Sequence, residues 1–183
     1  FLILISSTPL FFSLITSQPK TKSHHNSPSI VHRDLSPGNI GFNSSDTITI
    51  FDFVDAKELK DRDQIGPGQY HATAMTGSIT YMAPEVYLGD PYGSPADVYS
   101  YGLLIWYMFY LQYPPFRGLT PEEHARAVFG PSTCRPRLVD SWPHKIKSLV
   151  GACWDVKPMY RINFLVISRI LVEHLHRKKT HGR

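Results

Sequence analysis

The chain has 183 residues, of which 42% are hydrophobic and 13% aromatic, and its formal net charge is +4. That content is enough to bury a core, so one compact domain is expected. Much of the positive charge lies in residues 174–183, which carry no aromatic side chains between the basic ones, so no nucleic-acid partner is expected. The two cysteines, Cys134 and Cys153, have no paired CxxC spacing, which argues against a disulfide framework and a zinc site.

The beginning of the chain differs in character from the rest. Residues 1–15 are largely apolar, but the stretch is too short to span a bilayer and is interrupted by Pro9, so membrane attachment is not supported. We interpret it as the remnant of a longer element or as sequence joined wrongly to the rest of the chain. Residues 18–28 are polar, bounded by prolines and without period, which is typical of a linker. We therefore expect residues 1–29 to be poorly ordered and residues 177–183 to form a solvated basic tail.

The next part of the chain predicts a hairpin and a loop. Two short apolar runs, residues 40–42 and 48–51, flank the polar residues 43–46, a pattern that predicts two strands joined by a turn. Residues 55–80 are polar and contain several glycines, so they are predicted to form a long loop. Loops of this length in compact domains are usually functional or disordered.

The remaining sequence predicts helices. Residues 97–111 are apolar nearly all round, which is typical of a helix buried at the centre of a domain. Residues 120–123 (TPEE) give a helix start with a Thr cap, Pro in the first position and Glu in the third. Residues 142–154 predict another helix, and residues 163–176 carry apolar side chains at helical spacing. The predicted fold class is therefore α+β, mainly α-helical with a small β-hairpin.

The chemistry of the chain is concentrated in residues 32–39, of sequence HRDLSPGN. Phosphoryl transfer needs a carboxylate that orients an attacking hydroxyl and accepts its proton, and oxygen ligands for magnesium. Asp34 and Asn39 lie on one turn-forming loop, so both can face the same cavity. An isolated Asp–Asn pair in a loop is most often turn chemistry, and only its context separates the two interpretations.

The context is a series of motifs in a fixed order. Residues 52–54 (DFV) follow the second predicted strand, residues 77–85 (GSITYMAPE) follow the long loop, and Asp97 opens the first long helix. Together with residues 32–39 these motifs resemble the catalytic lobe of a eukaryotic protein kinase. The resemblance covers about residues 30–176, and it implies a mainly α-helical kinase large lobe with the β-hairpin at the catalytic cleft.

The resemblance implies roles for the residues around the reaction centre. Asp34 resembles the catalytic base, and Asn39 and Asp52 resemble the two magnesium ligands, so ATP and Mg²⁺ are the expected cofactors. Ser78 occupies the position where serine/threonine kinases carry a hydroxyl residue, which can hydrogen-bond the catalytic aspartate. The expected substrate is therefore a Ser or Thr hydroxyl of a protein. The neighbouring sequence also resembles the tyrosine-kinase-like group, in residues 81–86, 97–100 and 134–136.

Other matching residues resemble regulatory or structural ones. Arg33 resembles the arginine that pairs with a phosphate on the activation loop, and Thr73 and Thr76 are the candidate acceptors of that phosphate from an upstream kinase. Glu85 is expected to pair with Arg161. The structural residues that the resemblance implies are His32, Phe53, Glu85, Asp97 and Arg161.

Besides the minor change of a common proline to Ile162 after Arg161, two residues depart from the family's pattern. Ser36, which we include in the cofactor site with Asn39 and Asp52, stands where a lysine usually helps to neutralise the γ-phosphate. Removal of such a charge-assisted contact costs a few kcal/mol of transition-state stabilisation. Val54 replaces the glycine of Asp-Phe-Gly and is stiff where glycine allows the loop to flip.

No G-x-G-x-x-G and no Val-Ala-x-Lys sequence precedes His32. We therefore expect that the small lobe is absent from this chain and is needed as a partner. The isolated chain is expected to bind Mg-ATP poorly. Two functions stay open: a fragment of an active serine/threonine kinase, or a catalytically impaired kinase-like module that acts as a protein-interaction scaffold. A kinase for small molecules is disfavoured by residues 77–85, which resemble the substrate-docking segment of protein kinases. The expected location is the cytoplasm, with a membrane-anchored parent protein left open.

Overall fold

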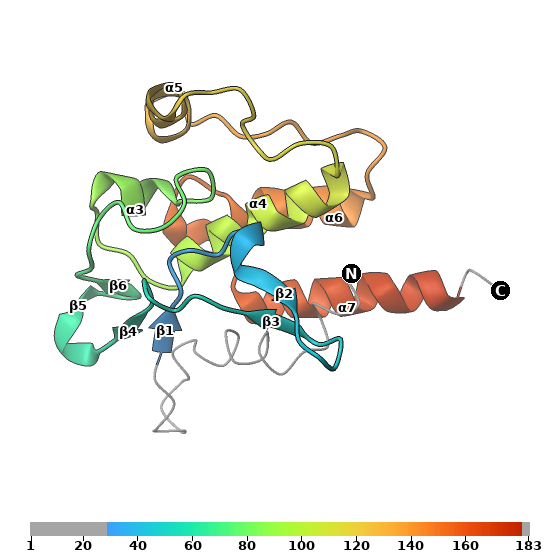
Figure 1. The fold of residues 1–183 in the computed structure, drawn as a ribbon, viewed down its shortest axis with the longest axis horizontal. Helices are drawn as coiled ribbons and strands as arrows, with labels where there is room; N and C mark the ends of the chain where they lie inside the picture. Colours follow the sequence, from blue (N-terminus) through green and yellow to red (C-terminus); the bar gives the residue numbers. More distant parts are fainter. Residues whose placement is uncertain (1–28, 181–183) are drawn as a thin grey trace.

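The computed structural model describes residues 29–180, which form a helical body with small sheets on one side (Figure 1). Within this range, all strands lie before residue 71, and all the α-helices begin at or after residue 84. This arrangement agrees with the predicted class of helices with a small β component. The predictions for residues 1–28 and 181–183 lie outside the described residues.

Three separate two-stranded antiparallel sheets account for the β-structure. The pairs are β1 (Ser29–Val31) with β4 (Lys57–Leu59), β2 (Ile40–Phe42) with β3 (Ile48–Ile50), and β5 (Gln64–Gly66) with β6 (Gln69–Tyr70). The β2–β3 hairpin confirms the prediction, with Ile40 opposite Ile50. The other two pairs lie where the sequence predicted only linker or loop, because strands of three residues leave no readable alternation.

Helices build the rest of the domain. They are α3 (Pro84–Leu88), α4 (Pro95–Tyr110), α5 (Pro121–His124) with its π-helical continuation (Ala125–Phe129), α6 (His144–Cys153) and α7 (Phe164–Thr180). The helices predicted near residues 97–111, 142–154 and 163–176 are therefore confirmed. In the part of the chain that the structure describes, no helix combines the length and the apolar character that crossing a bilayer requires.

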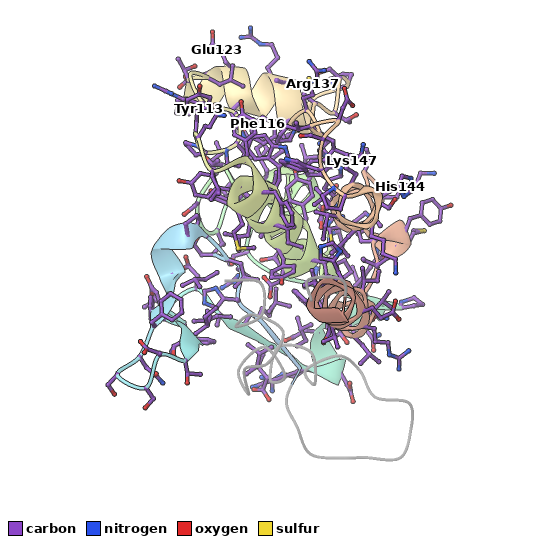
Figure 2. All side chains as sticks on the ribbon, turned by 90° about the vertical axis from the view of Figure 1, so that its right-hand side faces the viewer. Tyr113, Phe116, Glu123, Arg137, His144 and Lys147 are labelled. Atoms are coloured by element: carbon purple, nitrogen blue, oxygen red, sulfur yellow. The ribbon has the colours of Figure 1, made fainter. Side chains whose placement is uncertain are left out.

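The core is centred on α4, whose side chains are surrounded by the other elements (Figure 2). Every residue from Ala96 to Trp106 is buried, as the sequence predicted for a helix that is apolar nearly all round. The closest packing joins α4 to α6 at Gly102, where an added Cβ would lie 2.6 Å from the Cβ of Cys153. Glycine at this position therefore sets the distance between the two helices.

The start of α5 is fixed by a capping box, as predicted. The side-chain hydroxyl of Thr120 accepts a hydrogen bond from the N–H of Glu123 at 3.2 Å, and the N–H of Thr120 donates to Oε2 of Glu123 at 2.9 Å. The α-helix ends after one turn and continues as a π-helix to Phe129. The last residue of α5, His124, lies buried between the rings of Phe116 and Phe129.

Candidate active site

The predicted catalytic loop begins directly after β1 and is fixed from below by α4. The carboxylate of Asp97 accepts the N–H of His32 at 2.7 Å and the N–H of Arg33 at 2.9 Å. Burial raises the pKa of the Asp97 carboxyl, and these two N–H donors act in the opposite direction. The bonds hold Arg33 at a φ of 70°, a left-handed angle that non-glycine residues rarely adopt. The main chain just before Asp34 is therefore set by the first turn of the central helix.

Asp34 is half-buried and accepts a hydrogen bond on each carboxylate oxygen. The Nδ2 group of Asn39 donates to Oδ2 of Asp34 at 2.9 Å and to the main-chain oxygen of Asp34 at 2.9 Å. The main-chain N–H of Ser78 donates to Oδ1 of Asp34 at 2.8 Å. The sequence pointed to the hydroxyl of Ser78, and the bond seen here comes from its main chain instead. Two donors from different segments thus fix the orientation of the carboxylate.

The close approach of Ser78 depends on the glycine before it. Gly77 has a φ of 91°, and an added Cβ would lie 2.3 Å from the main-chain oxygen of Arg33 and 3.1 Å from the Cβ of Asp34. Only glycine fits a left-handed angle in so little space. The substrate-docking segment after the long loop therefore rests directly on the catalytic loop.

Asp52 is brought to the same region by the residue before it. The N–H of Phe51 donates to the main-chain oxygen of Asn39 at 2.9 Å, and Nε2 of His32 lies 3.0 Å from the main-chain oxygen of Phe51. The ring of Phe53 meets that of buried His32 edge-on, with centroids 4.8 Å apart. Bonds on both sides of Phe51 thus place Asp52 beside the loop that carries Asn39.

The donor chemistry of Asn39 and Asp52 fits magnesium. The amide nitrogen of Asn39 is used by Asp34, which leaves its side-chain carbonyl oxygen as a ligand, and Asp52 adds a carboxylate. Mg²⁺ prefers such oxygen ligands and usually takes one or two carboxylates together with phosphate oxygens. Residues 29–180 contain no cluster of three or more His, Cys, Asp or Glu side chains placed to hold a metal.

The two departures from the family's pattern differ in their surroundings. Ser36 is buried, and its main-chain oxygen accepts the N–H of Asn39 at 3.1 Å, so this residue shapes the turn that carries Asn39. Val54 is 90% exposed. Its N–H donates a long bond of 3.4 Å to Oδ1 of Asp52. Neither side chain supplies a positive charge to the site.

The predicted regulatory residues also come together. Nη1 of Arg33 donates to Oγ1 of Thr73 at 2.5 Å, and the hydroxyl of Thr76 lies 3.2 Å from that of Thr73. Thr73 is exposed. A phosphate on Thr73 would therefore sit beside the guanidinium of Arg33.

Glu85 and Arg161, which lie far apart in the sequence, form a buried bidentate pair. The two nitrogen–oxygen distances are 2.6 and 2.8 Å, and Arg161 donates further to the main-chain oxygens of Pro95 and Asp155 at 2.9 Å each. The guanidinium also lies over the ring of Tyr99, 5.1 Å from its centroid. This pair ties the end of the substrate-docking segment to the turn before α7.

Sequence reasoning missed one residue of this site, Tyr92. It is fully buried, and its hydroxyl contacts both Arg33 and Thr73. The sequence around it carried no signal for this contact. Contacts of this kind depend on the tertiary fold.

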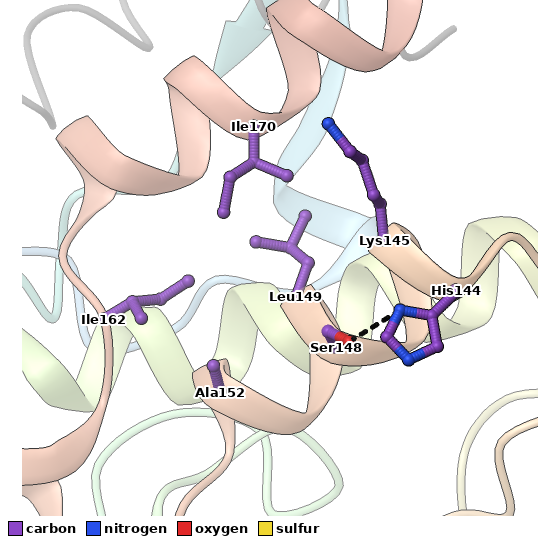
Figure 3. Close-up of a pocket in the computed structure, with 7 residues that line it drawn as sticks. All are labelled: His144, Lys145, Ser148, Leu149, Ala152, Ile162 and Ile170. Atoms are coloured by element: carbon purple, nitrogen blue, oxygen red, sulfur yellow. Dashed lines mark hydrogen bonds between the residues drawn. The ribbon is translucent and has the colours of Figure 1, made fainter.

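A cavity of about 360 Å³ lies elsewhere, between α6 and α7 (Figure 3). Its lining is mostly aliphatic, with Leu149, Ala152, Ile162 and Ile170, and Lys145 stands at its edge. None of its lining residues belongs to the catalytic loop or to residues 52–54. The cavity therefore takes no part in the site described above.

Comparison with known proteins identifies the family. The sequence model of the family described as protein tyrosine and serine/threonine kinase matches residues 13–171, beginning ahead of the boundary at residue 30 that the motifs suggested. Serine/threonine-protein kinase VIK of Arabidopsis thaliana is 32% identical over 177 residues, which cover 92% of this chain and 38% of that protein.

Two relatives come from Dictyostelium discoideum. Dual specificity protein kinase shkA is 34% identical over 146 residues, covering 77% of this chain and 26% of that protein. A probable serine/threonine-protein kinase is 30% identical over 162 residues, covering 88% of this chain and 11% of that protein. The chain spans well under half the length of these curated relatives. The family match and the hydrogen-bonded loop of Asp34 and Asn39 agree: this chain belongs to the protein tyrosine and serine/threonine kinase family.

Proposed function

We propose that the described residues form the large lobe of a protein kinase domain that transfers the γ-phosphate of ATP to Ser or Thr hydroxyls of a protein substrate. The observation that carries this proposal is the doubly oriented carboxylate of Asp34, held by Asn39 at 2.9 Å and by the N–H of Ser78 at 2.8 Å. An aspartate that only formed a turn would need no hydrogen bond from the distant residue Ser78. It would also not need the glycine, Gly77, that allows Ser78 to approach it closely.

The residues perform distinct steps in this proposal. Each oxygen of Asp34 accepts one hydrogen bond and keeps a further lone pair, so the carboxylate can accept the proton of an attacking hydroxyl while its orientation stays fixed. Asn39 and Asp52 would hold Mg²⁺ through oxygen atoms. When bound, the metal would neutralise charge on the transferred phosphate.

The position of Ser78 supports Ser/Thr substrates. Its main chain contacts the catalytic carboxylate, so its side chain lies next to the place where the substrate hydroxyl would be oriented. A small hydroxyl side chain there leaves room and adds a hydrogen-bonding group for an aliphatic alcohol.

A phosphotransfer assay on the full-length protein that contains this chain tests the proposal. Asp34→Asn should lower the rate by at least about 100-fold, because the base is lost. Asp46→Asn is the matched control: Asp46 lies in the hairpin turn at a φ of 55°, which Asn tolerates, and it should retain the wild-type rate. Equal and measurable rates of phosphotransfer for Asp34→Asn and the wild type would remove Asp34 from the role of base.

A second candidate function is a kinase-like scaffold with impaired catalysis. It is favoured by Ser36 and Val54, because neither supplies the charge or the backbone freedom that the family's pattern has at these positions. The same assay separates the two functions. A folded full-length protein that binds Mg-ATP and has no phosphotransfer above that of Asp34→Asn would support the scaffold.

Phosphorylation of Thr73 or Thr76 by an upstream kinase is the proposed mode of regulation, because Arg33 already contacts Thr73. Mass spectrometry of the protein from its own cells should find a phosphate on one of these two residues. A complete map of residues 55–80 without phosphate, from cells in which the protein is active, would contradict this mode.

A further inference from the structure

The guanidinium of Arg33 is surrounded by neutral acceptors. Its Nε group donates to the main-chain oxygen of Asp55, and Nη1 donates to Oγ1 of Thr73 at 2.5 Å and to the hydroxyl oxygen of Tyr92 at 3.1 Å. Among the residues that the structure describes, no carboxylate forms an ion pair with it. The guanidinium is therefore held by hydrogen bonds to neutral oxygen atoms, while the carboxylate of Asp97 accepts only the main-chain N–H of Arg33.

The hydroxyl of Tyr92 is used as both donor and acceptor. It accepts the bond from Arg33, and it donates its own hydrogen to the main-chain oxygen of Thr73 at 2.8 Å. Tyr92 is 1% exposed, so water is not available to replace either bond. One buried oxygen atom thus links the arginine of the catalytic loop to the main chain of the long loop.

The main chain around Tyr92 holds the same part of the long loop. Its N–H and C=O pair with Tyr70 at 3.2 and 3.1 Å. At the next residue, a Cβ added to Gly93 would lie 2.4 Å from the main-chain oxygen of Gly68, so the backbones are in close contact. A further main-chain bond of 2.9 Å joins Met75 to Val86. Residues 70–75 are therefore docked on the helical body by neutral contacts.

From these contacts we propose that Tyr92 is a positioning residue that keeps residues 70–75 docked and Arg33 oriented before any phosphate is added. The hydroxyl holds Arg33 on one side and Thr73 on the other, so the loop has its docked position in the unphosphorylated protein. The effect of this docked position on catalysis rests on the proposed function. The docking of residues 70–75 is independent of that function. A phosphate on Thr73 would then reinforce an existing arrangement.

The physical basis is the loss of two hydrogen bonds at one buried oxygen atom. Without the hydroxyl of Tyr92, the main-chain oxygen of Thr73 keeps, among the described residues, only the longer contact from the hydroxyl of Thr76 at 3.3 Å. The guanidinium of Arg33 also loses one of its acceptors. Hydrogen bonds to a charged group contribute more than those between neutral groups. Because the two bonds share one oxygen, they are lost as a unit. The loop should therefore open more often when only this atom is removed.

Hydrogen–deuterium exchange on the whole chain tests this directly. Tyr92→Phe should speed exchange of the amides of Tyr70 and Met75 by about tenfold, which corresponds to about 1.4 kcal/mol of local opening. Tyr99→Phe is the matched control: Tyr99 is also fully buried, and its hydroxyl has no hydrogen-bond partner among the described residues. The control should leave exchange at Tyr70 and Met75 unchanged. Equal exchange in Tyr92→Phe and in the wild type would overturn the proposal.

A charge rescue separates positioning from simple loss of packing. Thr73 is exposed, so Thr73→Glu can place a carboxylate beside Arg33. In the double variant Tyr92→Phe/Thr73→Glu, exchange should return to within about threefold of the wild type, because an ion pair replaces the neutral bridge. A packing defect would not respond to charge, so a double variant that exchanges as fast as Tyr92→Phe would also count against the proposal.

Phosphotransfer by the same variants of the full-length protein connects the position to catalysis. Unphosphorylated Tyr92→Phe should be about tenfold slower than the wild type, and Thr73→Glu should restore most of the loss. If the wild type transfers no phosphate, the proposed function fails, and the exchange result still decides whether Tyr92 docks the loop. If exchange changes as expected and transfer by an active protein stays constant, the link to catalysis is wrong.

Discussion

Residues with left-handed main-chain angles surround Asp34. Arg33 has a φ of 70°, Asp52 a φ of 59° and Gly77 a φ of 91°. For a non-glycine residue this region costs about 1–2 kcal/mol. At Arg33 the cost is offset by the two hydrogen bonds that the N–H groups of His32 and Arg33 donate to Asp97, which would be lost in an unstrained conformation. The strained angles therefore mark the points where the chain turns sharply to bring separate segments to one carboxylate.

The substitution Gly77→Ala should destabilise the protein and move Ser78 away from Asp34. The left-handed angle costs about 1–2 kcal/mol, and the clash with the oxygen of Arg33 adds about 1–3 kcal/mol. Gly68→Ala is the control, because Gly68 also has a positive φ, of 69°, and has no atoms within 4 Å of an added Cβ. Urea denaturation should give a clearly larger loss for Gly77→Ala. Equal losses of stability in the two variants would mean that the main chain around Gly77 can move away from Arg33 without cost.

The catalytic-loop residues and the pairing of Glu85 with Arg161 were predicted from sequence, and the contacts of Tyr92 and of the main chain of Ser78 were not. Asp34, Asn39 and Asp52 were found because their order and spacing follow a known motif. Tyr92 was missed because its partners Arg33 and Thr73 are distant in sequence and become neighbours only in the fold. The bond from the N–H of Ser78 was missed because any residue has that group, so the sequence cannot indicate it.

Among the elements, α4 and α6 depend on glycine for their close contact. An added Cβ at Gly102 would lie 2.6 Å from the Cβ of Cys153, and both residues are in the core. Burial also raises the pKa of the Cys153 thiol, so this thiol stays protonated at neutral pH. The helix pair therefore has no room for a larger side chain at this crossing.

Gly102→Ala should lower the free energy of unfolding by about 1–3 kcal/mol through overpacking. Gly151→Ala, in α6, should raise it by about 0.5–1 kcal/mol, because alanine favours the helix. No atom lies within 4 Å of a Cβ added to Gly151. Chemical denaturation of the two variants should therefore show changes of opposite sign. A gain in stability for Gly102→Ala would show that α4 and α6 separate easily.

The buried histidine at the end of α5, His124, should make the stability of the domain depend on pH. Neither ring nitrogen of His124 has a hydrogen-bond partner among the described residues, and burial lowers its pKa below the usual 6.5. The unfolded chain therefore takes up a proton first, so the stabilisation is present above about pH 6.5 and is lost as the pH falls further.

Replacement of His124 should reduce the loss of stability that occurs as the pH falls. Between about pH 7 and pH 5, His124→Leu should lose less stability than the wild type, since the variant has no proton to take up in the unfolded state. Denaturation at about pH 8 supplies the control, because there the difference between the two proteins reports packing alone. Parallel curves down to about pH 5 would show that His124 is protonated equally in both states.

The elements that could be predicted from sequence were those with a long run of apolar residues at helical spacing or with a capping motif. The helices near α4, α6 and α7 and the capping box at Thr120 were found because these signals are local. The pairing of β1 with β4 was missed because it joins three-residue strands across a long stretch of sequence. The β5–β6 hairpin lies in a polar, glycine-containing segment that is typical of a loop, and it is stabilised by contacts with Tyr92.

At the scale of the whole molecule, the ion pair of Glu85 and Arg161 joins distant parts of the chain. Arg161 makes four hydrogen-bonded contacts, to Glu85 and to the main-chain oxygens of Pro95 and Asp155. Both charged side chains are almost fully buried. The pair thus fixes α3, the start of α4 and the turn before α7 relative to one another.

Arg161→Ala should destabilise the whole domain by about 3–5 kcal/mol, because it leaves the carboxylate of Glu85 buried without a partner. Arg137→Ala is the control, since its ion pair with Asp140, at 3.6 Å, is almost fully exposed and should contribute little. The midpoints of thermal unfolding, measured side by side, should separate the two variants clearly. A small shift for Arg161→Ala would show that the elements are held by packing alone.

The hydrogen bonds that the catalytic loop donates to Asp97 link the position of this loop to the central helix. The side chain of Asp97 spans the whole distance between the first turn of the central helix and the main chain just before Asp34. Protein interiors are densely packed and hardly compressible, so a helix inside one moves very little. The position of the proposed base therefore depends on the packing of the buried central helix, and loosening of the core would misplace Asp34 before the domain unfolds.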